Sequence, residues 1–480
     1  MFLFPHKNVI FVLLFPHKNV IFVLLFPHKI VFLQCNSICI SMERTIYTKL
    51  IEWKNALGRK PLMLLGARQV GKTYILKQFG SREFKNLVYV NCHNNDFAMN
   101  LFSDFDIERI VYQIGIQMEQ QIVPGETLLV FDEIQEVHNG IASLKYFCEN
   151  KPDLHVAVAG SLLGISLKED ESFPVGKVNT LRMYPMTFSE FLSASHREKL
   201  SEAIKELDYD TMRLLNVECV EWLRQYFFTG GMPEAVAKWI ETHDPVVVRK
   251  IHHEILEAYY MDFSKHTKTE VQRIRMVWDS IPVQLAKENK KFIFGVVKKG
   301  ARAAQFETAI QWLVDAGLVI KVNRCNQPRQ PLKFYMDSAA FKIYLLDCGL
   351  FATLCETKPS DMLLSDNAFV EFKGAFAENY VLQQITASAQ IPVYYYSKDG
   401  STQEVDFLVQ TPDRIVPLEV KAEENVKSKS LSTFVKEDFK SLNLKGLRCS
   451  MKPYIDQGWM ENIPLYAVEA YFSNVVNSAL

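Results

Sequence analysis

The 480-residue chain lacks several features that would point directly to a class of protein. Its nine cysteines include no C-x-x-C pair, which argues against a zinc site or a disulfide framework and favours free thiols in a reducing cytoplasm. The formal net charge is only −1, so any contact with nucleic acid has to come from a local basic patch. The chain also has no N-K-x-D motif, which would be expected if it read guanine.

Long uninterrupted apolar runs are missing as well. Residues 3–13 read LFPHKNVIFVL, residues 14–24 repeat them unchanged, and a third copy begins at Leu25. His-Lys interrupts every copy, so no run reaches the roughly 18–20 apolar residues of a membrane span, and no signal-peptide cleavage pattern follows. We expect residues 1–41 to be a repetitive leader from a misassigned start, with translation beginning at Met42. A leader that associates with a membrane is the alternative.

A phosphate-loop motif follows this leader. Residues 66–73 read GARQVGKT, which matches G-x-x-x-x-G-K-[ST], between an apolar run at 61–65 and a helical pattern at 74–79. Glycines allow successive backbone N–H groups to surround a phosphate at a helix N-terminus. We expect Lys72 to reach the β- and γ-phosphates and Thr73 to bind Mg²⁺. The nucleotide-binding residues expected here are Gly66, Ala67, Arg68, Gln69, Val70, Gly71, Lys72 and Thr73.

Two carboxylates end a second apolar run, TLLVFDE, at residues 127–133. Asp132 is placed to hold Mg²⁺ through water, and Glu133 to polarise an attacking water as general base. A strand that merely ends in surface acids is less favoured downstream of an intact phosphate loop. Ser161, after a further strand at 154–159, is a candidate sensor of the γ-phosphate and is equally suited to a helix N-cap. The pattern favours nucleotide hydrolysis.

The rest of the chain divides by pattern. Residues 42–200 alternate strands and helices, which predicts a parallel sheet with helices on both faces. Residues 201–269 read as a helical lid or connector. Residues 270–350 suggest a winged helix, with an amphipathic helix at 305–316, a strand at 318–322 and a wing formed by 331–336 and 341–346. Residues 351–480 form the last segment.

Basic residues surround the proposed winged helix, where they are suited to contact DNA phosphates. They are Lys298, Lys299, Arg302, Lys321, Arg324 and Arg329. The proposed recognition helix itself carries Glu307 and Asp315, so a protein-contact module of the same shape is an equal alternative.

The last segment carries a second chemical pattern. A helix at 375–387 bears Glu378, and strands at 404–409 and 414–422 bear Asp406 and the pair Glu419 and Lys421. Residues two apart in a strand face the same side, so Glu419 and Lys421 project together, and Asp406 is placed to share a metal ion with Glu419. A salt bridge on a solvent-exposed strand is the alternative for any one of them.

The ordered motifs resemble those of bacterial and archaeal AAA-type ATPases that carry a C-terminal nuclease-like domain. They are GARQVGKT, LLVFDEIQ, AVAGSLLG, FPVGK, YPMTFSEF and YFFTGGMPEA. The resemblance implies an α/β fold: an AAA-like P-loop sheet, a helical connector, a winged-helix-like segment and a restriction-endonuclease-like domain. It also implies ATP and Mg²⁺ as ligands and leaves DNA and further copies of the chain as candidate partners.

In the PD-(D/E)xK nuclease core that the last segment resembles, an Asp and the Glu of E-x-K bind Mg²⁺ or Mn²⁺, and the Lys activates water. Glu378, Asp406, Glu419 and Lys421 stand at the matching places, while Val405 replaces the Pro. We therefore weigh an ATPase coupled to a nucleic-acid-processing domain against a nucleotide-controlled binding switch with an inactive domain. A metabolite or nucleoside kinase is disfavoured, because no acceptor site is visible.

Overall fold

The computed structural model describes residues 42–160, 173–264, 267–287, 290–363, 373–422 and 428–478, and strands between residues 5 and 35. The chain forms two compact units, residues 1–42 and 43–480. The first unit is an antiparallel sheet that the repeat pattern did not predict. Its strands in order are β1 (Pro5–His6), β2 (Val9–Leu14), β3 (Val20–Phe26) and β4 (Lys29–Cys35).

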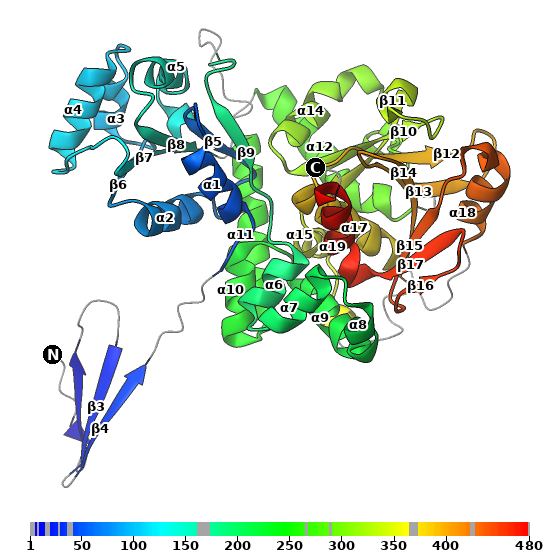
Figure 1. Cartoon of the computed structure of the whole chain (residues 1–480), viewed down its shortest axis with the longest axis horizontal. Helices are drawn as coiled ribbons and strands as arrows, with labels where there is room; N and C mark the ends of the chain where they lie inside the picture. Colours follow the sequence, from blue (N-terminus) through cyan, green and yellow to red (C-terminus); the bar gives the residue numbers. More distant parts are fainter. Residues whose placement is uncertain are drawn as a thin grey trace. The chain divides into compact units, whose positions relative to one another are not determined.

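The second unit begins with a five-stranded, fully parallel sheet (Figure 1). Its strands in spatial order are β6 (Asn86–Asn91), β7 (Thr127–Asp132), β8 (His155–Ala159), β5 (Leu62–Leu65) and β9 (Asn179–Arg182). Strand β7 is buried along its whole length, as expected for a parallel sheet covered on both faces. The parallel α/β arrangement predicted for this part of the chain is confirmed.

Helices cover both faces of this sheet (Figure 1). One core joins the sheet to α3 (Asp96–Leu101), α4 (Ile107–Gln117) and α5 (Gly140–Asn150), through side chains such as Ile110, Leu144 and Phe131. On the other face, α1 (Ile46–Asn55) and α2 (Lys72–Glu83) pack together through Trp53 and Phe79. Parallel strands need such crossovers, and α2 provides the one that starts at the phosphate loop.

A helical region follows the sheet. It consists of α6 (Phe188–Ala194), α7 (Glu198–Lys205), α8 (Tyr209–Leu214), α9 (Asn216–Thr229), α10 (Pro233–Thr242), α11 (Pro245–Phe263), α12 (Lys268–Leu285) and, later in the chain, α15 (Cys348–Leu354). The helical character predicted for residues 201–265 is confirmed over the part described. Among the described residues, no helix is both long enough and apolar enough to span a bilayer.

Helix α6 forms hydrogen bonds with residues from both ends of the second unit. Thr187 and Glu190 form a capping box, and Glu190 also accepts a buried hydrogen bond of 2.9 Å from Arg44 Nε. The first N–H groups of α6 donate to Gln384 and Glu469, at 2.9 and 3.0 Å. The YPMTFSEF motif therefore links the segment before α1 to α17 and α19 in the C-terminal part of the chain.

An eight-stranded mixed sheet completes the unit (Figure 1). Its order is β11 (Met336–Leu345), β10 (Val319–Cys325), β12 (Val393–Ser397), β13 (Glu404–Gln410), β14 (Ile415–Lys421), β15 (Gly446–Ser450), β17 (Met460–Pro464) and β16 (Ile455–Asp456). Helices α17 (Lys373–Ser388) and α18 (Lys429–Thr433) pack on it, and α19 (Val468–Asn477) packs on α17.

The segment predicted as a winged helix contributes two strands to that sheet. Helix α14 (Glu307–Asp315) buries Ile310 and Leu313, and Gly317 follows it with φ +71°. Strands β10 and β11 pair antiparallel, but residues 332–335 form a 3-10 helix where one side of the wing was expected. The N–H of Leu332 donates to the Gln410 side chain at 2.7 Å, which draws this segment towards β13. The winged-helix assignment remains a prediction.

Candidate functional site

The phosphate loop connects β5 to α2 through a backbone that uses left-handed conformations. Gly66, Gln69 and Gly71 have φ values of +146°, +66° and +97°. A Cβ atom on Gly66 would lie 2.2 Å from the carbonyl oxygen of Met183, so only glycine fits there. The sequence predicted this strand–loop–helix arrangement, and the structure confirms it.

Lys72 lies at the centre of the loop, where a phosphate would bind. Its Nζ donates hydrogen bonds to the carbonyl oxygens of Gly66 and Ala67, at 2.8 and 2.7 Å, and the residue is 7% exposed. Burial lowers the pKa of Lys72 to about 8, although the nearby carboxylates of Glu133 and Asp132 oppose that effect. A desolvated ammonium surrounded by curled backbone is suited to an anionic phosphate chain.

The residues expected to hold Mg²⁺ lie side by side. Thr73 Oγ1 donates to Asp132 Oδ2 at 2.7 Å, and the Tyr89 hydroxyl donates to the same oxygen at 2.7 Å. Burial, and then the hydrogen bond to Asp132, raise the pKa of Tyr89 well above its usual range. A hydroxyl and a carboxylate are the oxygen ligands that Mg²⁺ uses beside a nucleotide, so these residues fit the ion.

Glu133 follows Asp132 in an uncommon backbone conformation. Its φ of +53° is left-handed, and its carboxylate accepts a short hydrogen bond from the Gln135 side-chain amide. Strained backbone of this kind concentrates at functional sites, and here it turns the chain directly after β7. Ser161, the predicted γ-phosphate sensor, lies outside the described residues.

Helix α11 contacts the loop through two residues that the sequence reading missed. Asp262, which is 5% exposed on its side chain, pairs with Arg68 Nη1 at 2.8 Å. The Tyr259 hydroxyl donates to the carbonyl oxygen of Arg68 at 3.1 Å. Residues three apart share one helix face, so the YYMDF sequence at 259–263 carried a signal for this contact.

Three further basic residues separate into two groups. Arg44 Nη1 donates to the carbonyl oxygen of Val70 at 3.0 Å, inside the loop. A Cβ on Gly317 would come within 3.8 Å of Arg182 Nη1 and 3.7 Å of the Ala67 nitrogen, which brings Arg182 to the phosphate loop. Lys177 instead pairs with Glu149 of α5 at 2.9 Å. Arg182 therefore lies near the phosphate loop, whereas Lys177 is held at α5.

The second candidate site is a group of four carboxylates, two of them buried (Glu378 and Glu419) and two half-buried (Glu404 and Asp406), termed here the carboxylate cluster. Its members are Glu378 of α17, Glu404 and Asp406 of β13, and Glu419 of β14. Glu378 is 3% exposed, accepts a hydrogen bond of 2.8 Å from the Tyr344 hydroxyl and pairs closely with Lys290. Glu404 pairs closely with Lys342, which is fully buried.

Asp406 carries the clearest electrostatic perturbation of the cluster. Burial, and then the neighbouring Glu378 charge, raise its pKa to about 7, while Lys290 and Lys342 oppose the rise. Asp406 Oδ2 accepts a hydrogen bond of 2.8 Å from the Val420 N–H of the adjacent strand.

Glu419 and Lys421 project together, as the strand spacing predicted. Lys421 Nζ lies 2.9 Å from Glu419 Oε1, while Glu419 Oε2 is buried without a hydrogen-bond partner in the described part of the chain. The structure thus brings together the four residues predicted from the E-x-K pattern and adds Lys290 and Lys342. Lys342 stands alone in the apolar sequence FKIYLL, a signal that sequence reading did not use.

The described residues do not form a ready-made metal site. Within the described ranges, no group of three or more His, Cys, Asp or Glu side chains is placed to hold one. The described cysteines are free thiols.

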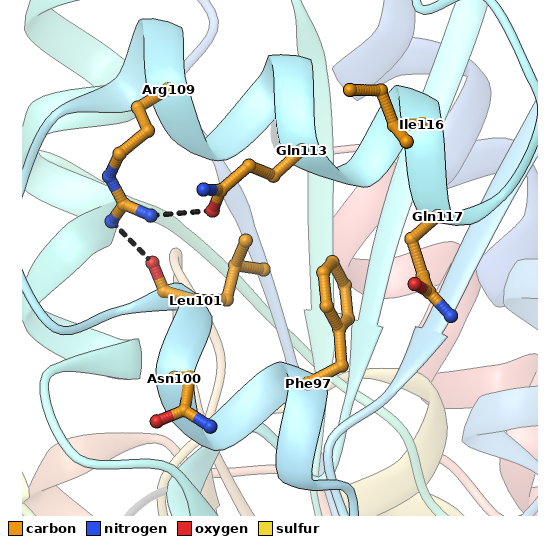
Figure 2. A pocket seen from close by; sticks show the side chains of 7 residues that line it. All are labelled: Phe97, Asn100, Leu101, Arg109, Gln113, Ile116 and Gln117. Carbon is orange, nitrogen blue, oxygen red and sulfur yellow. Dashed lines mark hydrogen bonds between the residues drawn. The ribbon is translucent and has the colours of Figure 1, made fainter.

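A pocket of 350 Å³ lies apart from both sites, between α3 and α4 (Figure 2). Phe97 and Leu101 contribute apolar side chains to the lining. Arg109 of α4 donates to the Leu101 carbonyl of α3 at 2.8 Å and to the Gln113 side chain of its own helix at 2.6 Å. No residue of the phosphate loop or of the carboxylate cluster lines it. It is therefore not the nucleotide site.

Comparison with known families agrees with the geometry of the first site. Residues 58–192 match the model of a family described as AAA domain. Residues 220–361 and 373–466 match two families described as domains of unknown function, DUF8612 and DUF4143. No curated protein matches the chain.

Two solved structures are similar to large parts of the chain. The Aeropyrum pernix ORC1 protein, solved in complex with DNA, is 13% identical, with 65% of this chain and 90% of that chain covered and a TM-score of 0.25. The Thermotoga maritima RuvB Holliday junction branch migration motor is 12% identical, with 61% and 91% covered and a TM-score of 0.28. TM-scores this low do not establish a common overall fold. Residues 58–192 are thus similar in sequence to an AAA domain, and they carry the phosphate loop on a parallel sheet.

Proposed function

We propose that the protein binds ATP with Mg²⁺ at the phosphate loop and hydrolyses it, and that this cycle controls a C-terminal domain that acts on or binds nucleic acid. The observation that carries the proposal is the constellation of Lys72, Thr73, Asp132 and Glu133 at the end of β5 and β7. Mg²⁺ bound beside Thr73 and Asp132 would neutralise negative charge on the phosphate oxygens. Lys72 would hold the β- and γ-phosphates, and Glu133 would accept a proton from the attacking water.

Phosphate release in the presence of ATP and Mg²⁺ tests the first half of the proposal. Glu133→Gln keeps the shape of the side chain but removes the base, so we expect ATP to bind and turnover to fall by at least about a hundredfold. Lys72→Ala should lose binding and turnover together. Turnover that is unchanged in both variants would refute the assignment.

Support for nucleic acid comes from the basic residues beside α14. Lys298, Lys299 and Arg302 are exposed, whereas Arg324 is held in ion pairs with Asp337 and Asp399. Exposed cations next to a helix favour contacts with a phosphate backbone. Cleavage of supercoiled plasmid and single-stranded DNA, with Mg²⁺ or Mn²⁺ and with or without ATP, tests whether the domain cuts, and Asp406→Ala is the control.

A second candidate function is a nucleotide-controlled binding switch whose nuclease-like domain does not cut. The pairing of Lys290 and Lys342 with the carboxylate cluster favours it, because these ammonium groups compete with a metal ion for the same oxygens. ATP turnover without any Asp406-dependent cleavage product would support the switch. Cleavage that disappears in Asp406→Ala would support the enzyme.

A further inference from the structure

The carboxylate cluster already contains its own cations. Lys290 pairs with Glu378, Lys342 pairs with Glu404, and Lys421 lies 2.9 Å from Glu419. These lysines come from three separate places: the segment before α13 (Phe294–Val297), strand β11 and strand β14. Buried carboxylates require such partners, and here three of the four have an ammonium group.

A fourth basic side chain lies beside Glu419, which already pairs with Lys421. Arg448 of β15 stands opposite Glu419 in the strand register, is 4% exposed, and donates from Nε to the Asn462 side chain at 2.8 Å. Four carboxylates and four basic side chains therefore share this part of the sheet. Among the described residues, the formal charges of these eight side chains cancel, so a divalent cation would add two positive charges to a region that is already balanced.

Lys290 is the cation that competes most directly with a metal ion for these carboxylates. Its side chain is 13% exposed, its partner Glu378 is 88 residues away, and its charge also acts on Asp406. A metal ion shared by these carboxylates would have to approach the Lys290 ammonium group or displace it. Repulsion between the two cations is strong where water is largely excluded.

Five of the eight carboxylate oxygens in the cluster already have a hydrogen bond or an ion pair. Glu419 Oε2 is buried and has no hydrogen-bond partner among the described residues, but Asp406 Oδ2 is taken by the Val420 N–H. Mg²⁺ requires about six oxygen ligands in octahedral geometry. Water can supply several of these ligands, but the ion still needs one or two carboxylates that are free to bind it. Ammonium groups already hold Glu378, Glu404 and Glu419, so the cluster does not fit the metal that the nuclease resemblance implies.

We propose that Lys290 is a built-in counter-cation that replaces a divalent metal ion at the carboxylate cluster, and that removal of its charge opens a divalent-cation site there. The inference goes beyond the proposed function, since it concerns the C-terminal site alone and does not depend on ATP turnover. It predicts that the unmodified chain leaves the cluster free of divalent metal, and that a single side chain decides this property.

Binding of Mn²⁺ to the full chain without nucleotide, followed by electron paramagnetic resonance, tests the proposal. The variants are Lys290→Gln, Lys291→Gln as the matched control one residue further along the chain, and Asp406→Asn alone and combined with Lys290→Gln. Any Mn²⁺ bound near Thr73 and Asp132 is common to all variants. The quantity of interest is therefore the binding that disappears with Asp406→Asn.

We expect no Asp406-dependent binding to the unmodified chain or to Lys291→Gln up to about 1 mM Mn²⁺. Lys290→Gln should gain one Asp406-dependent ion, bound at least about tenfold more tightly than this limit. Asp406-dependent binding to the unmodified chain would overturn the proposal. So would the absence of any gain in a Lys290→Gln protein with an unchanged circular dichroism spectrum.

If Lys290→Gln fails to fold, Mn²⁺ binding to the unmodified chain is compared with binding to Asp406→Asn. Equal binding supports the proposal, and weaker binding to Asp406→Asn overturns it. Phosphate release measured on the same samples keeps the two proposals apart. If the unmodified chain shows no ATP turnover, the proposed function is wrong, and the Mn²⁺ result still stands on its own.

Discussion

The depressed pKa of Lys72 predicts that ATP affinity falls at alkaline pH. Burial brings this pKa from its ordinary value of 10.5 to about 8 in the nucleotide-free protein, and a bound phosphate chain would raise it again by favouring the ammonium form. Binding above that pKa must therefore take up a proton. The affinity should stay constant below the free pKa and fall as pH rises through it.

The magnitude follows from the fraction of protonated Lys72. At about one pH unit above the free pKa, roughly a tenth of the molecules keep the ammonium group, so the apparent Kd should rise about tenfold, or about 1.4 kcal/mol. Equilibrium titration with a fluorescent ATP analogue between about pH 7.5 and pH 9.5 covers the window in which ATP itself does not change charge.

Lys72→Arg provides the matched control for this experiment. A guanidinium group remains protonated throughout the range, so the affinity of the variant, whatever its absolute value, should not depend on pH. A flat profile for the unmodified chain would refute the reasoning, because it would mean that Lys72 keeps its proton despite its burial. Equal slopes in both proteins would place the titrating group elsewhere.

Three further predictions concern stability and the loop. Gly66→Ala should abolish tight ATP binding, because the new methyl group would meet the Met183 carbonyl at 2.2 Å, and titration with the same analogue checks this. Thr187→Ala should lower the free energy of unfolding by about 1 kcal/mol through loss of the α6 cap, whereas Thr187→Ser should not, as measured in guanidinium chloride. Lys342→Met should lower the free energy of unfolding by about 3–5 kcal/mol, because it leaves the Glu404 carboxylate without its ion-pair partner. Adding Glu404→Gln should restore most of this stability. A loss below about 1 kcal/mol in the single variant would contradict the importance of the pair.

The sequence was informative where chemistry is carried by neighbouring residues. The loop at 66–73 could be predicted together with its flanking strand and helix, because its glycines and Lys72 act within one turn of chain. The positions of Asp406 and of the pair Glu419 and Lys421 could be predicted because strand periodicity fixes which side chains share a face.

Contacts between distant parts of the chain could not be predicted in this way. Arg68 and its partner Asp262 are 194 residues apart, and Lys290 is 88 residues from Glu378. A basic residue carries no local mark that distinguishes a surface charge from a buried partner. Only the packing of α11 on the loop and of α17 on the sheet determines these pairs.

The eight-stranded sheet has a consequence for how this chain can be divided. The family matches at 220–361 and 373–466 separate β10 and β11 from β12 and the strands beyond it, yet β10 pairs directly with β12. A fragment that begins at residue 373 would leave one side of β12 without its neighbour, and open strand edges of this kind promote aggregation. In this chain the two matched segments therefore contribute strands to one continuous sheet, and a cut between them exposes an edge of β12 that β10 covers.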